Sequence, residues 1–157
     1  TGHLVLSTLH TVNAASAPLR LMDMGIAPYL LADSLSLIIS QRIPGRLCPH
    51  CKRKVTLTEE KFADLSLPQE FLGETVMEAE GCEECHGSGI AGRIGAFEMI
   101  EIGREERQII RGGFSADKLQ ERMRAQGQPD MGTAALRELR EGWISARSAS
   151  QVIAGED

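Results

Sequence analysis

The four cysteines of the chain fall into two pairs of one kind, Cys48-Pro49-His50-Cys51 and Cys82-Glu83-Glu84-Cys85, with none left over. Two residues between thiolates allow a tight turn to point both sulfurs at one ion, and two such pairs complete a tetrahedral S₄ site for Zn²⁺. A site of this kind is closed to water, so it contributes folding energy and no catalysis. The spacing therefore predicts a structural zinc site held by Cys48, Cys51, Cys82 and Cys85.

Three other uses of paired cysteines compete with zinc. Structural disulfides suit a secreted chain, but the sequence opens with no basic-then-apolar signal segment, and an intracellular thiol pool would reduce them. A redox CxxC is usually single and opens a helix, and iron–sulfur clusters use other ligand spacings. While four thiolates are available, the adjacent His50 and His86 are interpreted as neighbours of the ligands.

The 30 residues between the pairs, 52–81, are more than a compact zinc ribbon needs. They predict a small insertion with a short helix that begins after Thr58. Charge is uneven around it. All the charged residues from 41 to 54 are Lys or Arg, whereas residues 55–86 contain nine acidic residues and a single basic one, Lys61. A solvated surface with internal charge pairing and a docking face for a partner of matching sign both fit this pattern.

Outside the cysteine region the pattern predicts an α/β fold. Residues 3–9 indicate a buried strand, and the chain turns polar at His10-Thr11, where open α/β sheets bind ligands. By its residue type alone, His10 is a structural hydrogen-bonding residue or a catalytic one, because no carboxylate lies near it in the sequence. The distance between His3 and His10 fits no metal-ligand spacing.

Caps and breakers predict where the helices lie. Asn13 can cap a helix that runs to Asp23 and is closed by Gly25, and residues 93–100 indicate a returning strand. A second helix should open at Pro28 with one apolar stripe, made of Leu31, Leu35, Ile38 and Ile39. Further helices are expected at 104–111, 115–126, 133–141 and from 148 onwards.

Length and composition limit the classes of function. The 157 residues, 42% hydrophobic and 25% charged, suit one compact domain or two small ones, and a net charge of −5 leaves no basic field to attract nucleic acid. The most apolar stretch, 30–39, is interrupted by Asp33 and is too short to span a bilayer. The start at Thr1 without an initiator Met predicts a piece of a larger protein. No GxxxxGK[ST] phosphate loop occurs in the sequence.

Several segments, in order, resemble the secretion ATPase superfamily, the hexameric motors of type II secretion and type IV pili. Residues 1–11, TGHLVLSTLHT, resemble its histidine box, and residues 20–26, RLMDMGI, resemble its RLLDMGI segment. Residues 40–43, SQRI, resemble its AQRL, and the two cysteine pairs with residues 92–98 resemble its tetracysteine insertion and the strand that follows. As a family, the pilus retraction motors lack this insertion, whereas secretion and pilus assembly motors carry it.

The resemblance implies the second half of a RecA-like P-loop ATPase core with an inserted zinc-binding subdomain and a C-terminal helical bundle. The expected divisions are residues 1–46, part of the core; 47–92, the zinc insertion; and 93–157, the return strand and helical subdomain. The phosphate-binding loop and the acidic boxes that hold Mg²⁺ would lie upstream of Thr1. His10 matches the residue that reaches the γ-phosphate of ATP, and His3 is a weaker candidate for nucleotide contact. The family commonly has Asn directly after the HT pair, but here Val12 intervenes.

By the same resemblance the parent protein is a cytoplasmic ATPase, peripheral to the inner membrane, that works as a homo-hexamer. Its zinc insertion would dock on the inner-membrane platform protein or on the cytoplasmic domain of another component, with no nucleic acid and no membrane insertion of its own. The isolated chain is expected to be inactive. The alternative is a stand-alone zinc ribbon or chaperone-like binding module, because residues 82–89 fit a CxxCxGxG repeat once.

Overall fold

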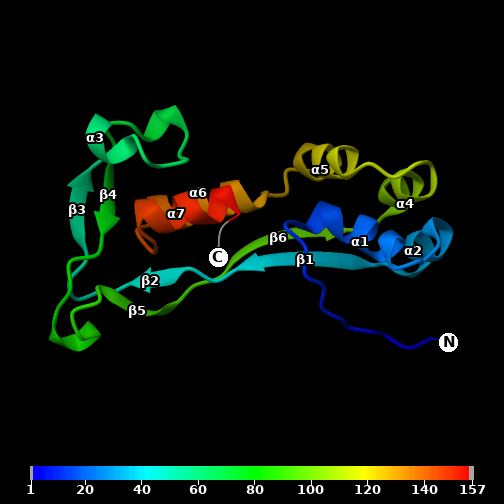
Figure 1. Cartoon of the computed structure of the whole chain (residues 1–157), viewed down its shortest axis with the longest axis horizontal. Helices are drawn as coiled ribbons and strands as arrows, with labels where there is room; N and C mark the ends of the chain where they lie inside the picture. The colour runs from blue at the N-terminus through cyan, green and yellow to red at the C-terminus, as the bar shows by residue number, and fades with distance from the viewer. Residues whose placement is uncertain (1, 156–157) are drawn as a thin grey trace. The chain divides into compact units, whose positions relative to one another are not determined.

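The computed structural model describes residues 2–155, which form helices and three two-stranded β-ladders (Figure 1). This mixture confirms the coarser expectation of a fold built from both helices and strands. The described residues divide into two compact units. Unit 1 comprises residues 2–40 with Met99–Gln128, and unit 2 comprises Gln41–Glu98 with residues 129–155.

Unit 1 is mostly helical. A 3₁₀ turn, Ala14–Ser16, leads into α1, Ala17–Asp23, and the other helices are α2, Pro28–Ser34; α4, Arg104–Arg111; and α5, Ala116–Ala125. The Asn13 side chain accepts a hydrogen bond from the Ser16 amide at 2.9 Å, which confirms the predicted cap. Gly25 has a φ of +90°, in the left-handed region that glycine tolerates, so it turns the chain after α1 as expected.

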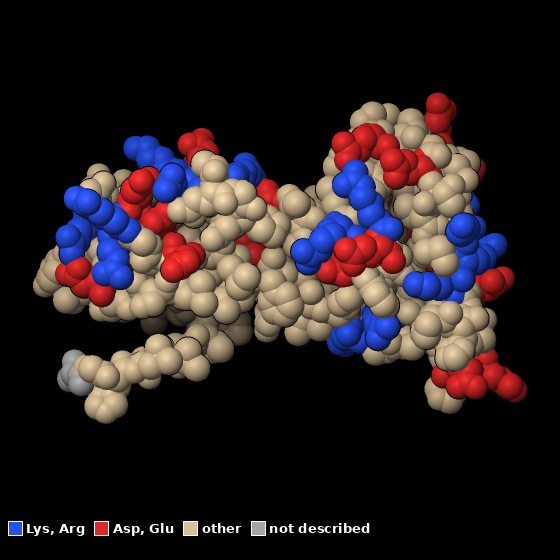
Figure 2. Space-filling view, turned by 180° about the vertical axis from the view of Figure 1, so that it is seen from behind, with Lys and Arg blue, Asp and Glu red and all other residues tan. Residues whose placement is uncertain are grey.

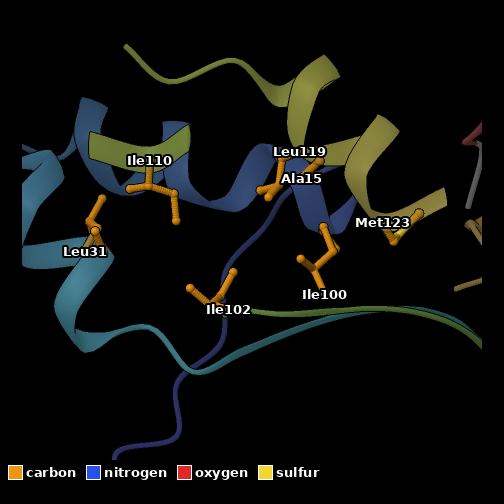
Figure 3. Close-up of a cluster of buried hydrophobic side chains, with 9 residues drawn as sticks. Ala15, Leu31, Ile100, Ile102, Ile110, Leu119 and Met123 are labelled. Carbon is orange, nitrogen blue, oxygen red and sulfur yellow. The ribbon is translucent and has the colours of Figure 1, made fainter. Parts of the chain in front are cut away.

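The core of unit 1 lies between these helices and the end of strand β6, Ala96–Glu101 (Figure 3). Leu31 of α2 and Ile110 of α4 meet Ile100, Ile102 and Leu119 there. Each fully buried side chain of this size contributes about 1.5–3 kcal/mol relative to an exposed one. The apolar stripes of four short helices therefore stabilise one another through a shared core.

Unit 2 contains two antiparallel ladders and three α-helices within the described residues. Strand β2, Gly45–Leu47, pairs with β5, Ile90–Arg93, and β3, Arg53–Thr56, pairs with β4, Thr75–Glu78. Between β3 and β4 lies a short helix, α3, Glu59–Phe62, which begins after Thr58 as predicted. Helices α6, Met131–Arg140, and α7, Ala146–Ala154, share an apolar core with this segment, made of Leu57, Leu67, Phe71, Val76, Leu139, Ile144, Ala146 and Ala149.

Strand β1, Leu37–Arg42, forms the third ladder with β6. Along β6 buried and exposed residues alternate, as the two-residue period of a strand with one covered face requires. Ala96, Glu98 and Ile100 are buried, whereas Phe97 and Met99 are exposed. Within residues 2–155, no helix is both long and apolar enough to cross a bilayer.

Three local expectations were wrong. Residues 3–9 form no buried strand: they have no regular structure and are exposed, because no strand of the described chain runs alongside to satisfy their backbone groups. The helix that opens at Pro28 ends at Ser34, and the β-branched Ile38 and Ile39 lie on β1 instead. The strand expected over 93–100 is present as β6, but its start was wrong, because Arg93 ends β5 and β6 begins only at Ala96.

The C-terminal helices confirm the expected positions. Helix α4 has the bounds predicted for it, and α5, α6 and α7 begin or end within two residues of the expected limits. Helices α4 and α5 belong to unit 1, whereas α6 and α7 belong to unit 2.

Candidate metal centre

Two ladders bring the cysteine pairs together. Cys48 follows β2, and β5 follows the second cysteine pair, so the β2–β5 ladder brings the start of the first pair close to the end of the second. Cys51 precedes β3, and Cys82 follows β4, so the β3–β4 hairpin brings the end of the first pair close to the start of the second. The Cys48 amide donates to the Gly89 carbonyl at 2.8 Å, which joins the two cysteine loops directly. The long spacer is therefore folded back as a hairpin, and its length does not separate the pairs.

The four sulfurs lie close together in unit 2. The Sγ–Sγ distances are 4.0 Å between Cys48 and Cys82, 3.7 Å between Cys51 and Cys85, and 3.7 Å between Cys82 and Cys85. All four atoms lie within 4.8 Å of one another. A tetrahedron with bonds of about 2.3 Å places its sulfurs about 3.8 Å apart. The separations thus fit a tetrahedral ion such as Zn²⁺ and exceed the roughly 2.05 Å of a disulfide.

Backbone amides point at the buried sulfur of Cys85. The Cys82 amide donates to it at 3.2 Å and the Gly89 amide at 3.1 Å. Desolvation opposes ionisation there, but these amides and the neighbouring thiols outweigh it and lower the pKa of Cys85 from 9.0 to about 6. At Cys51 desolvation dominates, and with the adjacent thiols it raises the pKa to about 12. One thiolate is thus favoured at neutral pH, and a cation is needed to ionise the whole set.

Gly89 has a role that the cysteine spacing does not reveal. Its φ is +69°, in the left-handed region, and a Cβ there would lie 2.5 Å from the Cβ of Ala79. Both the backbone conformation and the lack of space therefore exclude a side chain at this position. The absent side chain lets the Gly89 amide reach the sulfur of Cys85. The only signal in the sequence is the glycine four positions after the last cysteine, the final glycine of the CxxCxGxG match.

The two histidines beside the cysteines are exposed and are not part of the cluster. His50 lies between Cys48 and Cys51 in the first loop. His86 adopts a left-handed conformation, with φ of 52°, and ends the turn that carries Cys85. The described residues form one group with metal-ligand geometry, and it contains the four cysteines alone.

The candidate nucleotide residues lie far along the chain from this centre and belong to unit 1. His3 and His10 are exposed and lie in the irregular segment at the start of the described chain. The structure brings neither histidine together with a carboxylate or a hydroxyl in a catalytic arrangement within residues 2–155. Thr1, the first residue of the run that resembles a histidine box, lies outside the described residues.

The charged side chains are interspersed over the face drawn in Figure 2, and no large field of one sign occurs there. In unit 2 one acidic residue of the insertion, Glu70, forms an internal salt bridge. Arg140 of α6 forms a salt bridge with Glu70, and Arg140 also lies over the ring of Phe71, with 4.7 Å to the centroid. Internal pairing thus accounts for part of the acidic excess.

Comparison with known proteins gives one consistent result. A family model described as "Type II/IV secretion system protein" matches residues 1–151. A type IV pilus assembly ATPase of Myxococcus xanthus is 36% identical over 90% of the chain and 25% of its own length. The type II secretion system protein HxcR of Pseudomonas aeruginosa is 38% identical over 96% of the chain and 27% of its length. The type II secretion system protein E of Klebsiella pneumoniae is 43% identical over 72% of the chain and 22% of its own length. The chain thus spans about a quarter of the length of these relatives.

Proposed function

Because the chain belongs to the type II/IV secretion system protein family, we propose that it is the later part of an ATPase motor that drives pilus or pseudopilus assembly. The match over residues 1–151 carries this proposal, and relatives named as pilus assembly ATPases support it. The sequence contains no phosphate-binding loop. The proposal therefore assigns the loop and the Mg²⁺-binding acidic residues to sequence upstream of Thr1, and the isolated chain does not hydrolyse ATP.

In this motor the four cysteines hold a structural Zn²⁺. The sulfur separations of 3.7–4.0 Å and the two amides directed at Cys85 support this assignment. With four thiolates as ligands the ion has no open position, so it supplies folding energy and leaves the chemistry of ATP to other residues.

His10 is the proposed γ-phosphate residue, and His3 a weaker nucleotide contact. A donor positioned beside the transferred phosphate stabilises the charge that develops on its oxygens. The exposure of residues 2–10 leaves both side chains accessible to another part of the motor.

The proposed motor is a cytoplasmic homo-hexamer with a RecA-like core, in which residues 1–46 belong to the core. Residues 47–92 form the zinc-stabilised arm, which docks on the inner-membrane platform protein or on a cytoplasmic domain of another component. Residues 93–157 form the return strand and the helical subdomain. Hydrolysis between neighbouring subunits would then shift the arm as a rigid body.

The test uses the protein encoded by the complete coding sequence. That sequence should contain a GxxxxGK[ST] loop and acidic boxes upstream of Thr1, whereas a stand-alone zinc module would lack them. In the complete protein, His10→Ala should lower kcat for ATP by about 10²-fold, the usual cost of losing one transition-state donor. His50→Asn is the matched control, because His50 is exposed and lies outside the proposed nucleotide site.

Full ATPase activity in the His10→Ala protein would refute the role of His10. A complete protein without ATPase activity would refute the motor. For the 157-residue chain, Mg²⁺-stimulated turnover that His10→Ala abolishes would contradict the proposed inactivity. The docking role of the arm loses its support if full-length Cys82→Ser protein keeps its fold, its partner binding and its secretion activity.

A further inference from the structure

The turn between α6 and α7 touches the first cysteine loop at both ends. The Leu47 amide, directly before Cys48, donates to the Trp143 carbonyl at 2.8 Å. The Lys52 ammonium, directly after Cys51, donates to the Gly142 carbonyl at 2.8 Å. These contacts join residues almost a hundred positions apart in the sequence, within unit 2.

Two cations on either side of the first cysteine pair lie over the ring of Trp143. The Arg46 guanidinium lies 4.6 Å from the ring centroid and the Lys52 ammonium 5.3 Å from it. The Arg46 Nε is buried and has no hydrogen-bond partner among the described residues, so the aromatic face is the contact that holds this side chain. A Zn²⁺ with four thiolates carries a net charge of −2, which favours two cations beside the loop when the ion is bound.

The same turn also contacts the strand that leads to the second cysteine pair. The Glu78 carboxylate of β4 accepts from the Ala146 amide at 2.8 Å, at the first turn of α7. Gly142 has a φ of +70°, and a Cβ there would lie 2.7 Å from the Cγ of Met77, so β4 packs directly on the turn. Residues 142–146 therefore contact both chain segments that carry cysteines.

We propose that Trp143 is a positioning residue for the metal centre. Residues 142–146, the clasp, hold the two cysteine-bearing segments at the separation that four sulfurs around one ion require. Metal binding and the packing of α6 and α7 are then coupled, and by thermodynamic linkage the metal stabilises the helices as much as the clasp strengthens metal binding. This inference rests on the proposed metal site.

The primary test compares zinc affinity in three forms of the chain, by competition with a chromophoric chelator. Trp143→Leu should weaken zinc binding about tenfold, because both cation–π contacts are lost. Trp143→Phe should lie between wild type and Trp143→Leu, because it keeps an aromatic face. Arg140→Gln, at the end of α6, is the control: it removes a cation from the Phe71 ring at 4.7 Å together with the salt bridge to Glu70, neither of which involves the cysteine loops. Its zinc affinity should stay within about twofold of wild type.

Two further measurements separate the clasp from a general loss of structure. Co²⁺ absorption should show four sulfur ligands in each variant, because none of the substituted residues is a ligand. Amide hydrogen exchange in α7 should rise about tenfold when zinc is removed from the wild-type chain, and less in Trp143→Leu. If Trp143→Leu does not fold, Lys52→Gln replaces it and should weaken zinc binding about threefold, because it loses one of the two cations.

Zinc affinity in Trp143→Leu within twofold of wild type would overturn the clasp, and so would an equal loss in Arg140→Gln. Exchange in α7 that does not depend on zinc would also overturn it. In each of these cases the wild-type chain still binds the ion, so the proposed metal site stands. A wild-type chain that binds neither Zn²⁺ nor Co²⁺ would refute the metal site, and the clasp with it.

Discussion

The substitution Cys85→Ser tests the metal centre most directly. Cys85 is 6% exposed, its sulfur lies 3.7 Å from those of Cys51 and Cys82, and it receives two amide hydrogen bonds. Serine keeps the shape of the side chain but replaces a soft thiolate with a hydroxyl that binds zinc poorly. We expect the variant to retain three sulfur ligands and to lose most of its zinc affinity.

The size of the loss follows from the number of donors. Structural zinc sites bind with roughly 10–16 kcal/mol, and four comparable sulfurs divide this into about 2.5–4 kcal/mol each. At about 1.4 kcal/mol per factor of ten, the affinity should fall about 10²- to 10³-fold. Chelator competition measures this loss, and elemental analysis of the wild-type chain should find one zinc per chain.

The matched controls are His50→Asn and His86→Asn, which remove the two imidazoles next to the cysteines in the sequence. Asparagine tolerates the left-handed φ of 52° at His86, so the backbone turn is preserved. Both variants should bind zinc within about twofold of wild type. A fall in affinity at His50 or His86 as large as that at Cys85, or a Cys85→Ser variant within fivefold of wild type, would refute the four-sulfur assignment.

Three further outcomes are expected. In the metal-free chain the thiolate absorbance should begin to rise near pH 6, because the pKa of Cys85 lies below its ordinary 9.0, and should end only near pH 12 as Cys51 ionises; a single transition near 9 would contradict the amide contacts. Ile110→Ala should destabilise unit 1 by about 2–5 kcal/mol in denaturant unfolding, because the side chain is fully buried, and Ile110→Val by only about 1 kcal/mol. Gly142→Ala should lower the thermal midpoint of unit 2, since the left-handed backbone alone costs about 1–2 kcal/mol and the new Cβ meets Met77; an unchanged midpoint would refute the close packing.

Local signals in the sequence predicted the cysteine cluster and most of the helices. Two residues between cysteines define a loop whose sulfurs can share an ion, whatever lies between the loops. Asn13 caps its helix through a hydrogen bond three residues away, and α4 has the bounds that its flanking residues predict. These features depend on neighbours within one turn of the chain, so the residue pattern is enough.

Other features depended on partners that the pattern cannot identify. Residues 3–9 and residues 37–42 both contain an apolar run, yet only the latter form a strand, because β6 lies beside them to satisfy their backbone. The order of motifs alone identifies the family, although it does not show which groups surround each residue.

The sequence by itself determined which residues could hold a metal and to which family the chain belongs, because spacing and motif order are properties of the chain. Only the tertiary structure decided that the Cys48 amide bonds the Gly89 carbonyl and that Trp143 lies against the first cysteine loop. Contacts between such distant residues form only when many buried surfaces pack at once. The free energy that stabilises them comes from the packing of the whole unit, so no single segment of the sequence predicts them.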